Sequence, residues 1–403
     1  MKKSMIVAAM LAMVATGANA KSATDSATIA KNKPVFTVVK QNPITSIKDQ
    51  NRSGRCWAYS TLSYFESEIL KHTGKTYDLS EMFVANKTYM DRATMAVRMH
   101  GDVSFSQGGS AYDVLYALQH YGIVPEGAMP APGTLTGDSL ANFGEFFDVM
   151  TPYVEAVAKS NAKKISSAWK SGLQGIIDSY IGKTPEKFTY QGKQYTPQSF
   201  CQSLGLNLDD YVTITSYTHH PMWSKFAVEV QDNWRWPLSY NVPMDDLCKI
   251  IDNAINNGYT IAWGGDVTED GFTRKGLGIA YDVKKVRSMA GTDADHWFKL
   301  SKDEKKEKFD SLGVNAPEVV PTQAMRQEAF DNWETTDDHG MHIYGIAKDQ
   351  NGKEYYMVKN SWGEYGDYKG TWYMTKAFVA YKTMDFMVNK NAIPKDIRKK
   401  LGI

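Results

Sequence analysis

Cys56 is the first residue of the chain whose surroundings suggest chemistry. It lies in "DQNRSGRCWAYS", directly after Gly54 and Arg55. A thiol at the start of a helix meets unpaired backbone N–H groups and the positive end of the helix dipole, and both favour a thiolate. A buried structural cysteine fits this stretch equally well, so the rest of the chain must decide. The pattern that predicts a helix after Cys56 consists of Trp57, Leu62, Phe65 and Ile69.

A reactive thiolate needs a histidine base that a third group orients. Among eight histidines, His339 and His342 lie in a region with two β-rich runs, "HGMHIYGIAK" and "KEYYMVK". The turn signal "DQNG" between the runs predicts a hairpin. This hairpin would bring a histidine at one strand end to Asn360 at the other, and the amide would orient the imidazole without adding charge. Trp362 would shield that bond from water.

The remaining histidines give no metal-binding pattern. His219 and His220 are adjacent, and adjacent residues on one element point apart, so we do not expect them to share a metal. The ligand spacings HExxH and CxxC do not occur in the sequence. We therefore expect neither a metal nor a cofactor. Four histidines stand alone and are expected at the surface or in the core: His72, His100, His120 and His296.

The other two cysteines, Cys201 and Cys248, are expected to be small apolar core residues. A disulfide between them is the alternative, and the sequence leaves it open. Cys248 lies in "MDDLCKIIDNAINNG", whose apolar spacing predicts a helix that begins after Pro243 and ends at Gly258.

The composition is that of a globular protein. The chain has 403 residues, of which 42% are hydrophobic and 23% are charged, with a formal charge of +1. Such a neutral chain gives no electrostatic reason to bind nucleic acid or a membrane.

Residues 1–20 are typical of a secretory signal. They contain Lys2 and Lys3, then an apolar run, then Ala18-Asn19-Ala20 as an A-x-A cleavage site. We expect the mature chain, residues 21–403, to be periplasmic or secreted after cleavage following Ala20.

Three motifs together resemble the papain-like cysteine peptidases. They are "QNRSGRCW", "HGMHIYGI" and "KNSWG", and they carry Gln, Cys, His and Asn in the family's order. Among papain relatives, the chain is most similar to bleomycin hydrolase and aminopeptidase C. The resemblance implies that Cys56 is the nucleophile, His339 the base, Asn360 its orienting partner and Gln50 the oxyanion donor.

The resemblance also distinguishes between the two histidines. The family has a glycine six positions after the catalytic histidine, and Gly345 has this spacing from His339 but not from His342. Gly108 and Gly109 resemble the glycine wall that pairs with an extended substrate in the family. A plain turn is the alternative for this pair.

The fold implied by the resemblance is α+β, with two papain-like subdomains and a large insertion. The helical half with the nucleophile would span about 40–126, and the antiparallel β half with the histidine and asparagine about 246–390. A mainly helical insertion would occupy about 127–245, and a short tail about 391–403. All belong to one peptidase domain within residues 21–403.

The expected function is that of an exported cysteine peptidase acting on peptides, most similar to an aminopeptidase of the bleomycin hydrolase type. In those relatives, the C-terminal arm lies in the cleft and its carboxylate receives the substrate amine. Here the residues after Lys400 are expected to be too few for that reach, which predicts a relaxed N-terminal requirement or endopeptidase activity. The resemblance also implies a homohexamer. Two alternatives are a catalytically silent papain-like binding protein and acyl transfer to an amine or thiol.

Overall fold

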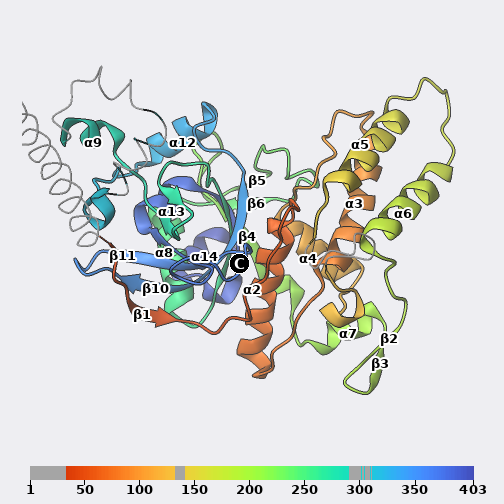
Figure 1. Ribbon diagram of the computed structural model, residues 1–403, viewed down its shortest axis with the longest axis horizontal. Helices are drawn as coiled ribbons and strands as arrows, with labels where there is room; N and C mark the ends of the chain where they lie inside the picture. Colours follow the sequence, from red (N-terminus) through yellow and green to blue (C-terminus); the bar gives the residue numbers. More distant parts are fainter. Residues whose placement is uncertain (1–32, 132–140, 290–300, 302–303, 305–308, 310) are drawn as a thin grey trace, which may run out of the picture.

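The computed structural model describes residues 33–131, 141–289, 301, 304, 309 and 311–403. Within them, two regions of different structure meet at helix α2, Cys56–Thr73 (Figure 1). Helices α3, α5 and α6 lie on the right in this view, and a large sheet with further helices lies on the left. The predicted signal segment, residues 1–20, lies outside the described residues.

The sheet is mainly antiparallel and has the strand order β5-β6-β4-β13-β7-β10-β11-β12-β9-β8, with β1 added to β10. A separate hairpin pairs β2 with β3. The strands are β1 (Thr37–Gln41), β2 (Phe188–Tyr190), β3 (Lys193–Tyr195), β4 (Tyr211–Thr215), β5 (Lys225–Phe226), β6 (Ser239–Asn241), β7 (Ile261–Gly265), β8 (Phe272–Thr273), β9 (Leu277–Gly278), β10 (His339–Lys348), β11 (Glu354–Lys359), β12 (Thr371–Thr375) and β13 (Thr383–Asn389).

Helices α2 to α7 form the helical region, whereas the later helices pack on the sheet region (Figure 1). The helices are α2, α3 (Glu81–Arg98), α4 (Ala111–His120), α5 (Gly144–Ala158), α6 (Ala168–Ile181), α7 (Pro197–Ser203), α8 (Met244–Asn256), α9 (Val283–Met289), α12 (Gln323–Asp331), α13 (Lys376–Lys382) and α14 (Lys395–Leu401). This combination confirms the α+β class predicted from the sequence.

Helix α2 is buried on nearly every face because it packs between the two regions. It contacts β10 and β7 on the sheet and α3 and α4 in the helical region. The helix ends where Gly74 adopts φ 69°, and the Gly74 N–H donates to the Leu70 carbonyl at 2.9 Å. Glycine adopts this left-handed conformation without a Cβ penalty, which makes it a natural helix terminator.

The hairpin formed by β10 and β11 has the predicted limits. Gly352 in the connecting turn has φ 82°, a conformation that again favours a residue without a Cβ. Nearly all of β10 is buried, since it lies between β7 and β11 and beneath α2. Tertiary packing on both faces therefore fixes the strand that starts at His339.

The range 127–245, expected as one helical insertion, has two parts in the structure. Helices α5, α6 and α7 pack on the helical region and share its apolar cluster. Strands β4 and β6, however, belong to the main sheet, where β4 pairs with β13. The β-rich segment could not be recognised in the sequence because each of its strands is only two to five residues long.

The three thiols are free, so Cys201 and Cys248 form no disulfide. Cys201 belongs to the apolar cluster of the helical region, whereas Cys248 packs against that of the sheet region. Among the described residues, no helix is both long and apolar enough to cross a membrane.

Candidate active site

Cys56 is the first residue of α2 and lies half-buried in a pocket of about 180 Å³. The N–H groups of a first helical turn have no acceptor within the helix, so they point toward a group placed at this end. The segment before the helix is held in place because the Gly54 N–H donates to Gln107 Oε1 at 2.7 Å. A side chain at Gly54 would lie 2.9 Å from Gln107 Cβ, which explains the glycine.

His339 reaches the same pocket from the first position of β10. The strand approaches the helix very closely here, since a Cβ at Gly340 would lie 2.7 Å from Ser60 Oγ and 3.2 Å from Trp57 Cα. A residue with a side chain at Gly340 would separate the two elements. The glycine therefore allows the thiol and the imidazole to share one cavity.

Asn360 follows β11 and fixes the orientation of the imidazole. His339 Nε2 lies 2.8 Å from Asn360 Oδ1, and Oδ1 also accepts the Ser361 N–H at 2.8 Å. Because this oxygen can only accept, we assign the ring proton to Nε2, which leaves Nδ1 free to take a proton. The Trp362 ring lies 4.9 Å from the imidazole, centroid to centroid, and contributes to its burial.

Gln50 is hydrogen-bonded to the loop that follows Asn360. Its Oε1 accepts the Ser361 hydroxyl at 2.6 Å, and its Nε2 donates to the Ser53 carbonyl at 2.7 Å. The Gln50 N–H also donates to the Ser361 carbonyl at 2.8 Å. Ser361 therefore links the amide of Gln50 to that of Asn360. Sequence reasoning passed over Ser361, although it stands inside the quoted motif "KNSWG".

Burial shifts the pKa values of both reacting groups. It raises the pKa of the Cys56 thiol to about 11, although the backbone N–H groups of Gly340 and Trp57 act in the opposite direction. It lowers the pKa of His339 to about 4, and the hydrogen bond to Asn360 opposes that shift. Each of these pKa values describes one group becoming charged while the other stays neutral. A proton passed from thiol to imidazole forms both charges together, and each then stabilises the other.

Comparison with known proteins agrees with this geometry. The chain matches the Peptidase C1-like family over residues 2–402. The chain belongs to this family. It is therefore a cysteine-type peptidase, and family membership favours hydrolysis over a silent binding scaffold.

Its similarity to individual members extends over most of the chain. Aminopeptidase G from Lactobacillus delbrueckii subsp. lactis is 23% identical, over 89% of this chain and 84% of the relative. Aminopeptidase C from Lactobacillus helveticus is 24% identical, over 90% and 85% respectively. The crystal structure of PepW from Lactobacillus rhamnosis HN001 has a TM-score of 0.69 at 20% identity and covers 94% of this chain and 86% of that chain. The fold is thus papain-like, as the motifs predicted.

In this peptidase, His342 occupies a different environment from His339. It is fully buried beneath α2, where Nδ1 lies 2.9 Å from the Ser63 hydroxyl. Lys359 donates to the same hydroxyl at 2.7 Å. Burial and this neighbouring ammonium lower the pKa of His342 well below its usual value. The structure thus places His342 in the core, outside the set of residues that line the Cys56 pocket.

Gly108 and Gly109 line the pocket, and each makes a close approach to another side chain. A Cβ at Gly109 would lie 2.9 Å from the Trp57 ring. A Cβ at Gly108 would lie 1.8 Å from Asp232 Oδ2. The segment that carries Asp232 therefore lies directly against the glycine wall. No sequence pattern indicates this contact, because the two positions are far apart along the chain.

Four carboxylates also line the pocket, which sequence reasoning missed: Asp232, Asp337, Asp338 and Asp385. Asp232 forms an ion pair with Arg92 at 3.1 Å. Asp338 accepts a hydrogen bond from the Thr336 hydroxyl at 2.8 Å.

The other two carboxyl groups are less well compensated. Burial raises the pKa of Asp385 to about 6, and its only hydrogen bond within the described chain is a long one of 3.5 Å from Ser239. The Asp337 side chain is exposed at the surface of the pocket. The protein around its carboxyl group, together with the carboxylates of Asp232 and Asp385, raises its pKa well above the usual range. This part of the pocket would therefore be stabilised by a cation.

The last residues of the chain lie elsewhere. Leu401 is buried in the apolar cluster of the sheet region, and Ile403 packs against the same cluster. The Lys400 ammonium lies 4.3 Å from the centroid of the Trp223 ring. Among the described residues that line the Cys56 pocket, none comes from 391–403.

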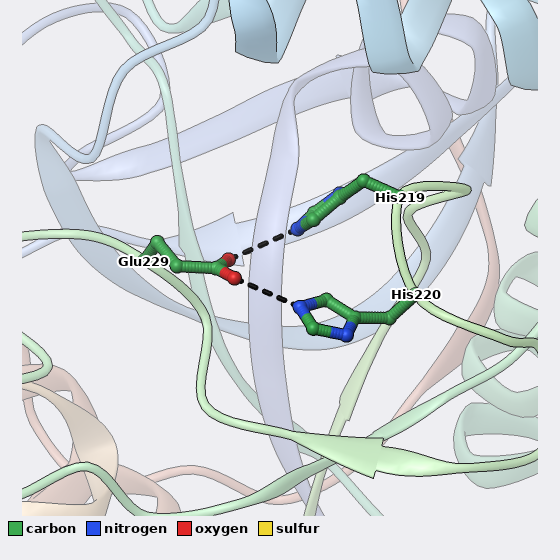
Figure 2. A group of neighbouring side chains, drawn as sticks. All are labelled: His219, His220 and Glu229. Carbon is green, nitrogen blue, oxygen red and sulfur yellow. Dashed lines mark hydrogen bonds and ion pairs between the residues drawn. The ribbon is translucent and has the colours of Figure 1, made fainter.

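The expectation that His219 and His220 point apart was wrong. Both Nε2 atoms hydrogen-bond to one carboxylate, that of Glu229, at 3.0 and 2.8 Å (Figure 2). The alternation rule applies to an extended strand, whereas the two histidines lie in a bend after β4. Neighbouring side chains can converge in such a bend.

Proposed function

We propose that the protein is an exported aminopeptidase that uses Cys56 as nucleophile and His339 as base. His339 Nδ1 takes the thiol proton, and the thiolate attacks the substrate carbonyl. His339 then gives this proton to the leaving amine and later activates the water that cleaves the thioester. The hydrogen bond between His339 Nε2 and Asn360 Oδ1 is the observation that carries this assignment, because it leaves Nδ1 as the acceptor.

The developing oxyanion would be stabilised by the Gln50 side chain and the Cys56 backbone N–H. Donors fixed before the reaction are effective because they need no reorganisation as charge develops. Gln50 meets this requirement, since Ser53 and Ser361 hold both ends of its amide. Trp362 would limit access of water to the bond between His339 and Asn360.

The carboxylates of the pocket support recognition of a free substrate amine. Asp232 lies against Gly108 on the wall where an extended substrate would run. An N-terminal ammonium there would meet Asp337 and Asp385, whose charges are only partly compensated. On this proposal, side chains of the cleft take the role that the C-terminal carboxylate has in the resembling enzymes.

Kinetics with one fluorogenic peptide in free-amine and N-acetylated forms test this assignment. We expect acetylation to lower kcat/KM by at least about tenfold, as loss of a charge-assisted contact would. The variants Asp337→Asn and Asp385→Asn should reduce this preference, whereas Asp209→Asn, at an exposed position, should preserve it. An unchanged preference in both cleft variants would contradict the role of the carboxylates.

Endopeptidase activity is the second candidate, and a larger cavity favours it. A space of about 810 Å³ shares Val230, Asp232, Asp337 and Met384 with the Cys56 pocket. An N-terminal extension of the substrate has room to continue past Asp232 into this space. Cleavage of an internal bond at a rate equal to that of the N-terminal bond would favour this function over the aminopeptidase.

Labelling separates peptidase function from the silent scaffold. An epoxysuccinyl inhibitor should modify Cys56 in the folded, reduced protein, and mass spectrometry would locate the label. Cys201 should stay unlabelled because it is buried. Absence of label on Cys56 would oppose the proposed nucleophile. Product analysis with an added amine or thiol would reveal acyl transfer.

Export and assembly are further parts of the proposal. Export rests on the signal pattern of residues 1–20, so the extracytoplasmic protein should begin at Lys21 when sequenced. Protein that retains Met1 in the cytoplasm would oppose it. A homohexamer rests on the resemblance alone, and light scattering at micromolar concentration should show an assembly larger than a monomer.

A further inference from the structure

We propose that His219, His220 and Glu229 form a binding site for a divalent transition metal of the Zn²⁺ class. The three side chains each offer one ligand atom, and these atoms lie within 4.8 Å of one another. Figure 2 shows the two imidazole edges aimed at the same carboxylate. Two imidazole nitrogens and one carboxylate oxygen are a donor set that Zn²⁺ accepts, at distances of about 2.0–2.2 Å.

The imidazole rings are held in place before any metal binds. His220 stacks on Phe226 with ring centroids 4.2 Å apart and planes 20° apart. His219 stacks on Phe330, which belongs to α12, with an interplanar angle of 22°. Because packing limits the rotation of both rings, little side-chain entropy remains to be lost on metal binding.

An outer group is available to set the tautomer of His219. His219 Nδ1 faces the Gln327 amide, with Oε1 at 3.3 Å and Nε2 at 3.1 Å, and Gln327 Nε2 also donates to Asp331 at 2.9 Å. The same Oε1 accepts the Thr218 N–H at 2.5 Å. In the tautomer that carries its proton on Nδ1, His219 donates to Gln327 Oε1, and Nε2 is left as the metal ligand. Metal-binding histidines in proteins commonly donate their second nitrogen in this way.

Metal binding would replace the present hydrogen bonds instead of adding to them. Each imidazole now faces Glu229 through Nε2, so the metal must enter between these atoms with neutral rings and an ionised carboxylate. Three protein ligands leave a tetrahedral ion one position for water. The side chains of all three remain partly exposed, at 29%, 36% and 54%, so an ion can reach them from solvent.

The site borders the substrate region without belonging to the Cys56 pocket. His219 and Glu229 line the larger cavity that shares residues with that pocket. Glu229 is followed by Val230 and then Asp232, which lies against Gly108. A metal would therefore fix the segment that carries Asp232 to the bend that carries the histidines.

Direct binding measurements test the site independently of peptidase activity. The protein should carry Cys56→Ala and no affinity tag, so that neither the reactive thiol nor added histidines bind the metal. We expect calorimetry to detect one Zn²⁺ per chain, and Co²⁺ to give the visible absorption of a tetrahedral complex. The double variant His219→Gln, His220→Gln should lose at least about 100-fold in affinity, since two of three ligands are removed.

Two matched variants complete the test. His72→Gln removes an exposed histidine at a distant position and should leave the affinity unchanged. Gln327→Met should lower affinity by about tenfold through the outer hydrogen bond. Circular dichroism melting would show that each variant folds. Failure to bind Zn²⁺ stoichiometrically, or equal affinity in the double variant, would overturn the proposal.

Discussion

Two groups of side chains at the active site differ sharply in how well their polar atoms are paired within the protein. His339, Asn360, Ser361 and Gln50 form a continuous set of hydrogen bonds of 2.6–2.8 Å. The surrounding protein raises the pKa values of Asp337 and Asp385, and neighbouring carboxylates add to the shift of Asp337. The first group is neutral and fixed by its own contacts, whereas the second needs a partner from outside.

The difference suggests a division of roles. Groups that transfer protons must be positioned before the substrate arrives, so hydrogen bonds within the protein hold them. Groups that select a substrate gain from being uncompensated, because the ligand then supplies the missing charge. Variants of the two groups should accordingly affect different kinetic constants.

The largest expected effect comes from the proton-transfer group. Cys56→Ala and His339→Ala should each lower kcat/KM by at least about 1,000-fold, because either change removes a group that acts directly on the reacting atoms. Hydrolysis of a free-amine peptide by purified protein would measure this loss.

His342→Ala is the matched control for that prediction. It removes a fully buried imidazole, so the melting temperature should fall. The activity of the folded fraction, counted by titrating Cys56 with the epoxysuccinyl inhibitor, should stay within about threefold of wild type. If His342→Ala were inactive and His339→Ala active, the assignment of the base would be wrong.

A smaller effect is expected at Ser361, which positions both amides without touching substrate. Ser361→Ala should lower kcat by about tenfold with little change in KM, because Gln50 Oε1 loses its hydroxyl donor, while the backbone N–H of residue 361 still donates to Asn360 Oδ1. Ser361→Thr keeps the hydroxyl and should restore most of the rate. Ser203→Ala, at an exposed position, should have no effect. A rise in KM alone would place Ser361 in substrate binding instead.

The elements that carry Cys56, His339 and Asn360 could be predicted from the sequence because their signals are local. Cys56 stands at a helix start, His339 and Asn360 flank a hairpin with a clear turn, and each motif keeps its own spacing. Side chains alternate between the two faces of a strand, so His339 and His342 on β10 are expected to face opposite sides. The α+β class followed from the same patterns.

The acidic group could not be predicted in this way. Asp232, Asp337 and Asp385 come from three separate segments, and only packing of the sheet against α2 brings them together. The convergence of His219 and His220 on Glu229 depends on the geometry of a bend, which the sequence does not specify. Contacts between short polar segments far apart in the chain leave no periodic hydrophobic pattern in the sequence, so they cannot be predicted from it.

The titration of Asp385 gives a sharper test of the acidic group. Its pKa of about 6 means that the carboxylate is charged above this pH and neutral below it. Attraction for a substrate ammonium is therefore present above pH 6 and lost as pH falls through 6. The ratio of kcat/KM between wild type and Asp385→Asn should fall from about tenfold at pH 7.5 toward one at pH 5. A ratio independent of pH would oppose this role.

The smallest effect on specificity is expected from the end of the chain. Deletion of Leu401–Ile403 removes a side chain that is only 9% exposed in the apolar cluster of the sheet region. Loss of this burial should cost about 1–3 kcal/mol of stability, visible as a lower melting temperature. The ratio of kcat/KM for free-amine and acetylated peptides should stay unchanged, because these residues do not line the Cys56 pocket.

Lys399→Ala, on the exposed face of α14, is the control and should change neither the melting temperature nor this ratio. If the deletion instead allowed acetylated peptides to be cleaved faster, the terminal residues would reach the cleft during catalysis, and amine recognition would belong to them and not to the aspartates.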